Sequence, residues 1–348
     1  MNDTSAYSTI DKSNMLAAIE KAAEHLTPPS DADSTCDFNL EAPENLVFGG
    51  VGGSGIVGEV LSDYCRTAIG IPSFVCRTPR IPNFVGKRTL CIAISYSGTT
   101  NETLGMYDQA RSAGAQLASV CSGGRLLALS RTDKIPYVRV PENLLPRVAL
   151  PEMLAATVFV IGKAGVVKDS RRLLRTAAEA VATQIGTMKL SIPLTENKAK
   201  QAAMALNNRL PLLIGGEENA SVLRRFKNEL NENSKVPAFY FALPEAYHDD
   251  IEGLSTLSQL CKTQPFLLHG QNESEGDMKT ASGLEKLLVE LGFATPISFE
   301  GKGDDRLGWL LSAIIFGDYA STYLAILRDV DPSSLNLIPK FRAIRGQV

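Results

Sequence analysis

The sequence lacks the features by which nucleic-acid-binding and metal-binding proteins are usually known. Its 35 Lys and Arg residues stand against 38 Asp and Glu residues, for a net charge of −3. The basic residues form no block that could neutralise a run of phosphates. The three histidines, His25, His248 and His269, are scattered, and no two cysteines form a C-x-x-C pair. We therefore expect neither a nucleic-acid partner nor a protein-ligated metal.

A leader segment and long hydrophobic runs are also lacking. The N-terminal stretch MNDTSAYSTIDKSNML has no basic start and no apolar core, so no signal peptide is expected. The most apolar stretch, residues 307–317, is shorter than the roughly 20 residues of a membrane span. Several cysteines lie in apolar segments, which indicates reduced, buried thiols. The six are Cys36, Cys65, Cys76, Cys91, Cys121 and Cys261. Together these features predict a soluble, cytoplasmic protein with no membrane partner.

The chain does have the length and the periodicity of a two-domain α/β protein. Its 348 residues predict about two domains at roughly 150 residues each. Short apolar strands alternate with helices, which favours parallel sheets covered on both faces. Strands are expected at 45–49, 73–77, 89–95, 116–121, 136–140, 210–215, 236–242, 264–269 and 296–300. Helices are expected at 13–27, 54–68, 100–113, 151–166, 170–187, 218–231, 280–292 and 306–327. We predict two doubly wound parallel-sheet domains, 41–187 and 188–348, after an N-terminal helix and loop over 1–40 and with a helical tail at the C-terminus.

The first motif that indicates a site is GGVGGSGIVG at residues 49–58, which follows a strand and opens a helix. Glycines let the backbone approach an anion, and a helix N-terminus supplies free N–H groups. The motif also matches G-x-G-x-x-G, but a dinucleotide site expects an acid at the end of the next strand. That strand ends in Val-Cys-Arg-Thr, where only Arg77 could face a 2′-phosphate. A phosphate monoester site is favoured over a dinucleotide site and over a purely structural turn.

The second motif, SYSGTTNETL at residues 95–104, also joins a buried strand to a helix. It places four hydroxyls, on Ser95, Ser97, Thr99 and Thr100, at a helix N-terminus. Hydroxyls and helix-end amides suit a small, doubly charged phosphate without needing Lys or Arg. The alternative is an ordinary Ser/Thr helix cap, which needs only one such hydroxyl.

The third motif combines NELNENSKVP at 228–237 with LPEAYHDD at 243–250. Glu232 stands where a helix gives way to a strand, so its carboxylate can lie at the mouth of the sheet. His248 follows in a loop that begins with proline. A carboxylate and an imidazole together can transfer protons, although a solvated Glu and an incidental loop His remain the alternative for this pair alone.

Together the three motifs resemble the bifunctional phosphoglucose/phosphomannose isomerase family, which is built from two sugar-isomerase (SIS) domains. The resemblance extends from residue 47 to about 342. It rests on GVGGSGI, SYSGTTNETL, ENSKVPAF, LPEAYH and the tail GDYASTYLAILRDVDPSS, in that order. It implies an aldose–ketose isomerase, without metal or other cofactor, that interconverts glucose 6-phosphate or mannose 6-phosphate with fructose 6-phosphate through a cis-enediolate. It also implies a homodimer with the site at the subunit interface.

The resemblance further assigns roles to individual residues. Glu232 would move the proton between C2 and C1, and His248 would assist ring opening, commonly from across the dimer interface. Arg147 would stabilise the enediolate, and the tail would supply a cation from Lys340 or, alternatively, Arg342. Phosphate and sugar oxygens would be bound by Gly52, Gly53, Ser54, Ser95, Ser97 and Thr100. Ser333 stands where the family has a threonine linked to admitting the mannose epimer.

This chain departs from the family pattern at a few positions. Thr99 and Asn101 replace Asn and Glu in the second loop, Asp249 replaces Asn after His248, and Ser333 replaces Thr. These changes leave the expected base and acid in place. Two other hypotheses stay open: a non-catalytic sugar-phosphate sensor of the SIS type, which needs only the two phosphate loops, and an NADP-dependent oxidoreductase, which would use the first loop and Arg77.

Overall fold

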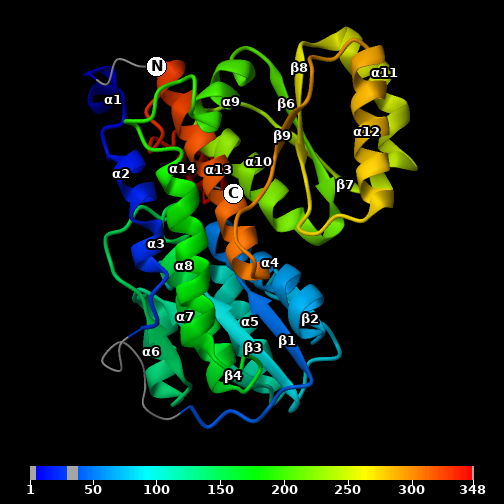
Figure 1. Ribbon diagram of the computed structural model, residues 1–348. Coiled ribbons are helices and arrows are strands. Elements are labelled where there is room, and N and C mark those ends of the chain that lie inside the picture. Colours follow the sequence, from blue (N-terminus) through cyan, green and yellow to red (C-terminus); the bar gives the residue numbers. More distant parts are fainter. Residues whose placement is uncertain (1–4, 30–37, 347–348) are drawn as a thin grey trace.

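The protein is built on two parallel β-sheets that flank a shared layer of helices (Figure 1). The computed structural model describes residues 5–29 and 38–346. The first sheet has the order β2-β1-β3-β4-β5 and the second the order β7-β6-β8-β9, and all neighbouring strands are parallel. The strands are β1 (Asn45–Gly49), β2 (Ser73–Cys76), β3 (Thr89–Ile94), β4 (Gln116–Cys121), β5 (Tyr137–Arg139), β6 (Leu210–Gly216), β7 (Phe239–Leu243), β8 (Thr263–Leu268) and β9 (Ile297–Phe299). The predicted fold class is confirmed.

The strand sequences explain why both sheets lie in the interior. In β3 and β8 every residue is buried, as expected for parallel strands that helices cover on both faces. In each sheet the strand order reverses between two neighbours, β1 and β3 in the first sheet and β6 and β8 in the second. Loops at the carboxyl ends of such a pair diverge and leave a crevice, which is where open α/β sheets bind ligands.

The helices cover the sheets and join them. They are α1 (Ser5–Ile10), α2 (Met15–Glu20), α3 (Ala22–His25), α4 (Gly53–Tyr64), α5 (Asn101–Ser112), α6 (Gly124–Thr132), α7 (Leu150–Lys163), α8 (Ser170–Gly186), α9 (Lys198–Leu206), α10 (Ala220–Glu232), α11 (Asp250–Leu260), α12 (Glu275–Glu290), α13 (Arg306–Leu327) and α14 (Leu337–Arg345). Residues of α5 and α6 cover the outer face of the first sheet, and residues of α11 and α12 that of the second. Between the sheets lie α4, α7, α10 and α13.

The helix predictions need three corrections. The helix expected over 13–27 is two short helices, α2 and α3, that meet at Lys21, and it is preceded by α1. The helix expected over 54–68 ends at Tyr64 and continues as a π-helical turn, η2 (Cys65–Ile69). Helices α6, α9 and α11 were not expected, because each is short, at 9, 9 and 11 residues, and shows a weak helical pattern of apolar residues. Tertiary packing, more than local periodicity, selects such helices.

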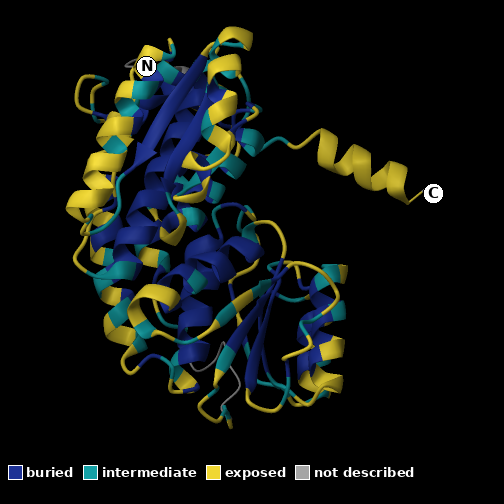
Figure 2. Ribbon diagram, turned by 90° about the vertical axis from the view of Figure 1, so that its right-hand side faces the viewer, coloured by how far each residue is buried: buried dark blue, intermediate teal, exposed yellow. Residues whose placement is uncertain are grey.

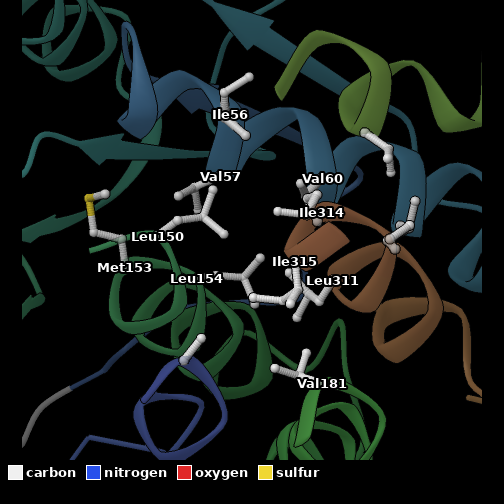
Figure 3. Close-up of a cluster of buried hydrophobic side chains, with 14 of the residues drawn as sticks. Ile56, Val57, Val60, Leu150, Met153, Leu154, Val181, Leu311, Ile314 and Ile315 are labelled. Carbon is white, nitrogen blue, oxygen red and sulfur yellow. The ribbon is translucent and has the colours of Figure 1, made fainter. Parts of the chain in front are cut away.

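The hydrophobic core between the two sheets is a single cluster that draws on both halves of the chain. Figure 3 shows side chains of α4, α7, α8 and α13 pointing at one another in this cluster. The central contacts come from Val57 and Val60 of α4, Leu154 of α7, and Ile314 of α13, each at most 1% exposed. Burying one such side chain stabilises the fold by about 1.5–3 kcal/mol. The shared core therefore fixes the relative positions of the two sheets.

Helix α13 has the expected bounds, 306–327, but its apolar stretch is longer than the expected residues 307–317. It has 22 residues with a mean hydropathy of 1.6, which is long and apolar enough to cross a membrane by composition alone. However, 94% of that stretch is buried against other parts of this protein. Such burial is typical of a core helix, and α13 packs against α8, α9 and α10.

The thiols in apolar segments, Cys76, Cys91 and Cys121, are buried as predicted. Cys65 is also buried, whereas Cys261 is half-buried. Burial raises the pKa of three of these thiols, those of Cys65, Cys91 and Cys121, to about 12. They are therefore protonated and unreactive at neutral pH. Cys36 lies outside the described residues, and the cytoplasmic location stays a prediction.

The C-terminal helix α14 extends away from the rest of the molecule (Figure 2). None of its residues is buried. Its apolar side chains Leu337, Phe341 and Ile344 are 77%, 63% and 49% exposed. The expected helical tail is therefore present, but within one chain its apolar side chains contact little of the body.

Candidate active site

The two glycine- and serine-rich loops meet at the point where the strand order of the first sheet reverses. The first loop follows β1 and the second follows β3. Ser54 Oγ accepts a hydrogen bond of 3.2 Å from the backbone N–H of Tyr96. A Cβ added at Gly50 would lie 3.0 Å from the carbonyl oxygen of Ile94. The N-termini of α4 and α5 thus open into the same crevice.

The hydroxyls of the second loop do not act as ordinary helix caps. The N-cap of α5 is Thr100, and its side chain makes no capping hydrogen bond. Instead, Ser95 Oγ donates to Thr100 Oγ1 at 3.1 Å, and Ser97 Oγ lies 3.0 Å from Thr99 Oγ1. The N-cap of α4, Gly52, has no side chain to cap with. Both helices therefore keep first-turn N–H groups that no capping side chain satisfies, which is the arrangement that binds an anion.

Gly98 determines the shape of the second loop. Its φ is +65°, a left-handed conformation that glycine adopts without strain. A Cβ there would lie 1.9 Å from the carbonyl oxygen of Gly123. The carbonyl oxygen of Gly98 accepts from the N–H of Leu126 at 2.8 Å. The segment that opens α6 thus supports the loop from behind.

Arg77 lies beside the first motif, since a Cβ at Gly55 would be 3.9 Å from its Nε, but its charge is already paired within the protein. Its guanidinium is paired with Glu59 of α4, and the other oxygen of the same carboxylate lies 3.0 Å from Arg224 Nε on α10. Both arginines thus use the Glu59 carboxylate, which links the two halves of the chain. The structure gives the NADP hypothesis no free cation at this position.

Arg147 is buried and its guanidinium is held on one side by protein oxygens. Nη1 donates to Asn233 Oδ1 and to the carbonyl oxygen of Pro332, both at 2.8 Å, and Nη2 donates to the carbonyl oxygen of Ser333 at 2.8 Å. Nε lies 3.7 Å from Glu232 Oε2. The preceding residue, Pro146, is next to the first loop, because a Cβ at Gly53 would lie 3.5 Å from its carbonyl oxygen. Arg147 therefore connects the phosphate loops with Glu232.

Glu232 is the last residue of α10 and lines a cavity of about 740 Å³. Its side chain is 32% exposed. Asn228 and Asn231 of the same helix line this cavity, together with the start of the tail at 334–338. Glu232 ends α10, as expected. Because α10 runs from the carboxyl end of β6 back toward the start of β7, its carboxylate lies away from the mouth of the second sheet and faces Arg147 instead.

Lys235, to which the sequence analysis gave no role, fastens the tail to the end of α10. Its Nζ donates to the carbonyl oxygens of Glu232 and Ser334, at 2.5 and 2.7 Å. Burial, followed by the nearby charge of Arg147, lowers the pKa of this ammonium. Lys235 lines the same cavity as Glu232. Lys235 is therefore a second cation near Glu232, and its ammonium is engaged with backbone oxygens.

A buried ionic network behind Arg147 was also missed. Arg225 Nη1 lies 2.8 Å from Glu229 Oε1, and its Nε lies 3.1 Å from Asp318 Oδ1. Two carboxylates thus compete for one guanidinium away from water, and burial raises the pKa of both acids. A signal was available, because Asp318 is the one acidic residue inside the apolar sequence of α13. A charge at such a position needs a buried partner.

His248 and the tail cations are not brought to Glu232 within one chain. His248 is exposed after the short helix η4 (Glu245–Tyr247), with its ring centre 4.6 Å from that of Tyr247. Lys340 and Arg342 are exposed on α14. Across the described part of the chain, no hydrogen bond or ion pair joins any of these three side chains to the residues that line the Glu232 cavity.

Ser333 takes part in the site through its backbone. Its hydroxyl donates to Asp331 Oδ1 at 2.7 Å and accepts from Ser13 Oγ at 2.8 Å. Its carbonyl oxygen is the one that Arg147 binds. The side chain that replaces the family threonine is thus already engaged with the protein.

The reversal point of the second sheet also has a cavity, of about 380 Å³, but its chemistry is different. After β8, the N–H of Gly270 donates to Glu273 Oε1 at 2.5 Å, and His269 Nδ1 lies 3.1 Å from Glu273 Oε2. Glu218 and Asp277 also line this cavity. A carboxylate of the protein therefore occupies the loop amide that an anion would need. Over residues 5–29 and 38–346, no group of three or more His, Cys, Asp or Glu residues is placed to hold a metal ion.

Comparison with known proteins identifies the family. The family model described as the bacterial phospho-glucose isomerase C-terminal SIS domain matches residues 195–344. A bifunctional phosphoglucose/phosphomannose isomerase of Aeropyrum pernix is 30% identical over 90% of this chain and 92% of its own. This chain belongs to the bifunctional phosphoglucose/phosphomannose isomerase family. The relative of the same name in Caldicellulosiruptor bescii is 27% identical over 93% of this chain and 96% of its own.

The fold agrees with this family assignment. The crystal structure of a glucose-6-phosphate isomerase like protein from Thermus thermophilus superposes with a TM-score of 0.68 at 16% identity, covering 99% of this chain and 98% of that one. At this identity the likeness concerns the fold alone. The family resemblance inferred from the motifs and the two SIS-type sheets are both confirmed.

Proposed function

We propose that this protein is an aldose–ketose isomerase that interconverts glucose 6-phosphate, mannose 6-phosphate or both with fructose 6-phosphate. The observation that carries the proposal is the sequence of contacts from the joined phosphate loops through Pro146 and Arg147 to Glu232. In this arrangement the buried cation Arg147 lies between the proposed anion site at the two loops and the proposed base, Glu232. Family membership gives independent support, because the relatives are named for this activity.

In this proposal the phosphate of the open-chain sugar binds at the N-termini of α4 and α5. Anchoring the phosphate holds the reacting carbons at a fixed position and lowers the entropic barrier. The carboxylate of Glu232 removes the proton from C2, and the C–H electron pair forms the C1–C2 double bond of a cis-enediolate. Returning the same proton to C1, while the hydroxyl proton on O2 passes to O1, leaves a carbonyl at C2 and gives the ketose. The charge on the enediolate oxygens is stabilised by Arg147, whose orientation is fixed before substrate binds.

The decisive experiment replaces the proposed base. Glu232→Gln keeps the shape of the side chain and removes its basicity, so kcat should fall by about 10²–10⁴-fold while the sugar phosphate still binds. The matched control is Glu179→Gln, a change at an exposed position of α8. Turnover is measured with glucose 6-phosphate and mannose 6-phosphate, and products are identified by NMR. Unchanged turnover in Glu232→Gln would exclude this mechanism.

The same assay separates the isomerase from a non-catalytic sensor. A sensor would show a thermal shift with a 6-phosphosugar but no interconversion by the wild-type protein. The sensor hypothesis has no use for the buried Arg147 or for Glu232, and their placement favours the enzyme.

The proposal includes a homodimer in which each site receives His248 from the partner subunit. His248 is exposed and lies outside the cavity of Glu232 in its own chain. The exposed apolar side chains of α14 also suit contact with a second copy. Mixing inactive Glu232→Gln with inactive His248→Ala after mild dissociation should restore about a quarter of wild-type activity, because half of the dimers then have one complete site of two. Failure to restore activity in mixed dimers would show that each chain uses its own histidine.

A further inference from the structure

A closed ring of hydrogen bonds runs behind the proposed active site. Arg147 Nη1 donates to Asn233 Oδ1 at 2.8 Å, and Asn233 Nδ2 donates to Glu229 Oε2 at 2.8 Å. Glu229 Oε1 is 2.8 Å from Arg225 Nη1. Arg225 Nη2 returns to the backbone, donating to the carbonyl oxygen of Arg147 at 2.6 Å. The ring therefore holds both the backbone and the side chain of Arg147.

The ring is closed to water. Arg225 and Glu229 are each 2% exposed, Asn233 is 0% exposed and Arg147 is 7% exposed. The second amide proton of Asn233 goes to Ser321 Oγ at 3.0 Å. Both donors and the acceptor of this amide are thus engaged, and no solvent molecule is needed to complete them. In every hydrogen bond of the ring, both the donor and the acceptor are groups of the protein.

We infer that Glu229 is a positioning residue for the isomerase reaction, because it fixes the direction of the Asn233 amide and thereby holds the Arg147 guanidinium facing Glu232. This inference rests on the proposed function. Both carboxylate oxygens of Glu229 face donors, Arg225 Nη1 and Asn233 Nδ2, so the carboxylate accepts on both sides and the nitrogen of the Asn233 amide points to it. The oxygen of the amide must then point to Arg147, the direction that the guanidinium requires. With the amide turned round, donor would face donor.

The expected effect is large because the site is buried. A buried donor without a partner destabilises its conformation by about 1–3 kcal/mol, which is enough to displace the guanidinium. Displacements of about 1 Å in a catalytic arrangement can lower a rate by roughly 10²-fold. Among the described residues, no hydrogen bond or ion pair joins Glu229 or Asn233 to the phosphate loops, so substrate binding should change little. Glu229 also pairs with Arg225, so the experiment must separate positioning from stability.

The first variant is Glu229→Gln, which has the same shape and places an NH₂ group against either Asn233 or Arg225. We expect kcat to fall by about 10²-fold and KM to stay within about threefold, because the cation acts only after the phosphate is bound. The control is Ser321→Ala, which also leaves one Asn233 N–H without its acceptor but keeps the amide direction set by Glu229, so it separates a lost hydrogen bond from a reversed amide. We expect kcat of the control to stay within about threefold of wild type.

The second variant restores the polarity with a compensating change. In the double variant Glu229→Gln with Asn233→Asp, the new carboxylate at 233 accepts from both Arg147 and the glutamine side chain. The net charge of the ring is unchanged, so kcat should recover at least about tenfold over Glu229→Gln. Melting temperatures are recorded for all variants. If Glu229→Gln alone fails to fold, the double variant is compared with wild type.

Each outcome gives a decision. Wild-type kcat in folded Glu229→Gln, or no recovery in the folded double variant, would overturn the positioning role while the isomerase activity of the wild type stands. A lower kcat with little change in KM, reversed in the double variant, supports the positioning role. A purely structural role would instead change melting temperatures and leave kcat of the folded enzyme unaltered. A wild-type protein that converts no 6-phosphosugar would overturn the proposed function and this inference with it.

Discussion

Arg147 Nε faces Glu232 Oε2 at 3.7 Å, while its two terminal nitrogens are bound at 2.8 Å to oxygens of other residues. The guanidinium is therefore held from behind and cannot move onto the base to form a tighter ion pair. This keeps a fixed positive charge beside a carboxylate that remains partly exposed. A developing enediolate would meet a cation that needs no reorganisation.

Replacing Arg147 by lysine should lower turnover sharply. A lysine ammonium keeps the charge but cannot bond Asn233 and the two tail carbonyls while also facing Glu232, because it lacks the planar fork of the guanidinium. We expect kcat to fall by about 10²–10³-fold, with a smaller change in KM. Steady-state kinetics with fructose 6-phosphate measure both. A variant that retains wild-type kcat would show that any nearby charge suffices.

Substituting Gly98 should damage both stability and phosphate binding. In Gly98→Ala the new methyl group would meet the carbonyl oxygen of Gly123 at 1.9 Å, in a backbone conformation that disfavours side chains. The loop must move, so KM for the sugar phosphate should rise by about tenfold or more, and the free energy of unfolding should fall by about 1–3 kcal/mol. The control is Gly186→Ala on α8, where an added Cβ meets nothing within 4 Å. Equal behaviour of the two variants would contradict the role given to the loop.

The pH dependence of stability should depend on Glu152. This buried residue of α7 pairs with His25, and burial raises its carboxyl pKa from 4.5 to about 7. The folded state therefore binds a proton that the unfolded state releases between pH 4.5 and about 7, so this group's contribution to stability falls as pH rises through that range. Desolvation lowers the pKa of His25, and His25 is kept in both the wild type and the Glu152→Gln variant that test this prediction.

Glu152→Gln removes this titration and keeps a hydrogen-bonding side chain beside His25. Its free energy of unfolding relative to wild type should increase between pH 5 and pH 8, by on the order of 1–3 kcal/mol. Urea unfolding at three pH values across this range provides the measurement. A difference between the two proteins that does not vary with pH would mean that Glu152 is ionised throughout.

The tail cation can be assigned by two alanine variants. Lys340→Ala should lower kcat by about 10²-fold, because the family resemblance places a tail cation at the enediolate. Arg342→Ala should leave kcat within about threefold. Both side chains are exposed, so neither change should alter the melting temperature of a single subunit. The reverse result would assign the role to Arg342.

The sequence predicts the parts of the site that depend on contiguous residues. Each phosphate loop is one strand–turn–helix unit, and Glu232 lies where α10 ends, so local patterns suffice. The buried ring joins residues 147, 225, 229 and 233, and Asp318 lies opposite it on α13. Such contacts depend on how the two sheets pack, which periodicity does not specify. Arg77 illustrates the same point, because its partner Glu59 lies on a different element.

The carboxylate of Glu273 has a consequence for the history of the protein. Two halves of like topology begin with equivalent crevices, but in the second one the protein's own acid occupies the amide beside Gly270. Under the proposed function, the loops of the N-terminal half bind the substrate anion, while the second half contributes α10, the helix that ends in Glu232. Specialisation of this kind makes the halves mutually dependent: neither, expressed by itself, would possess a complete reaction centre.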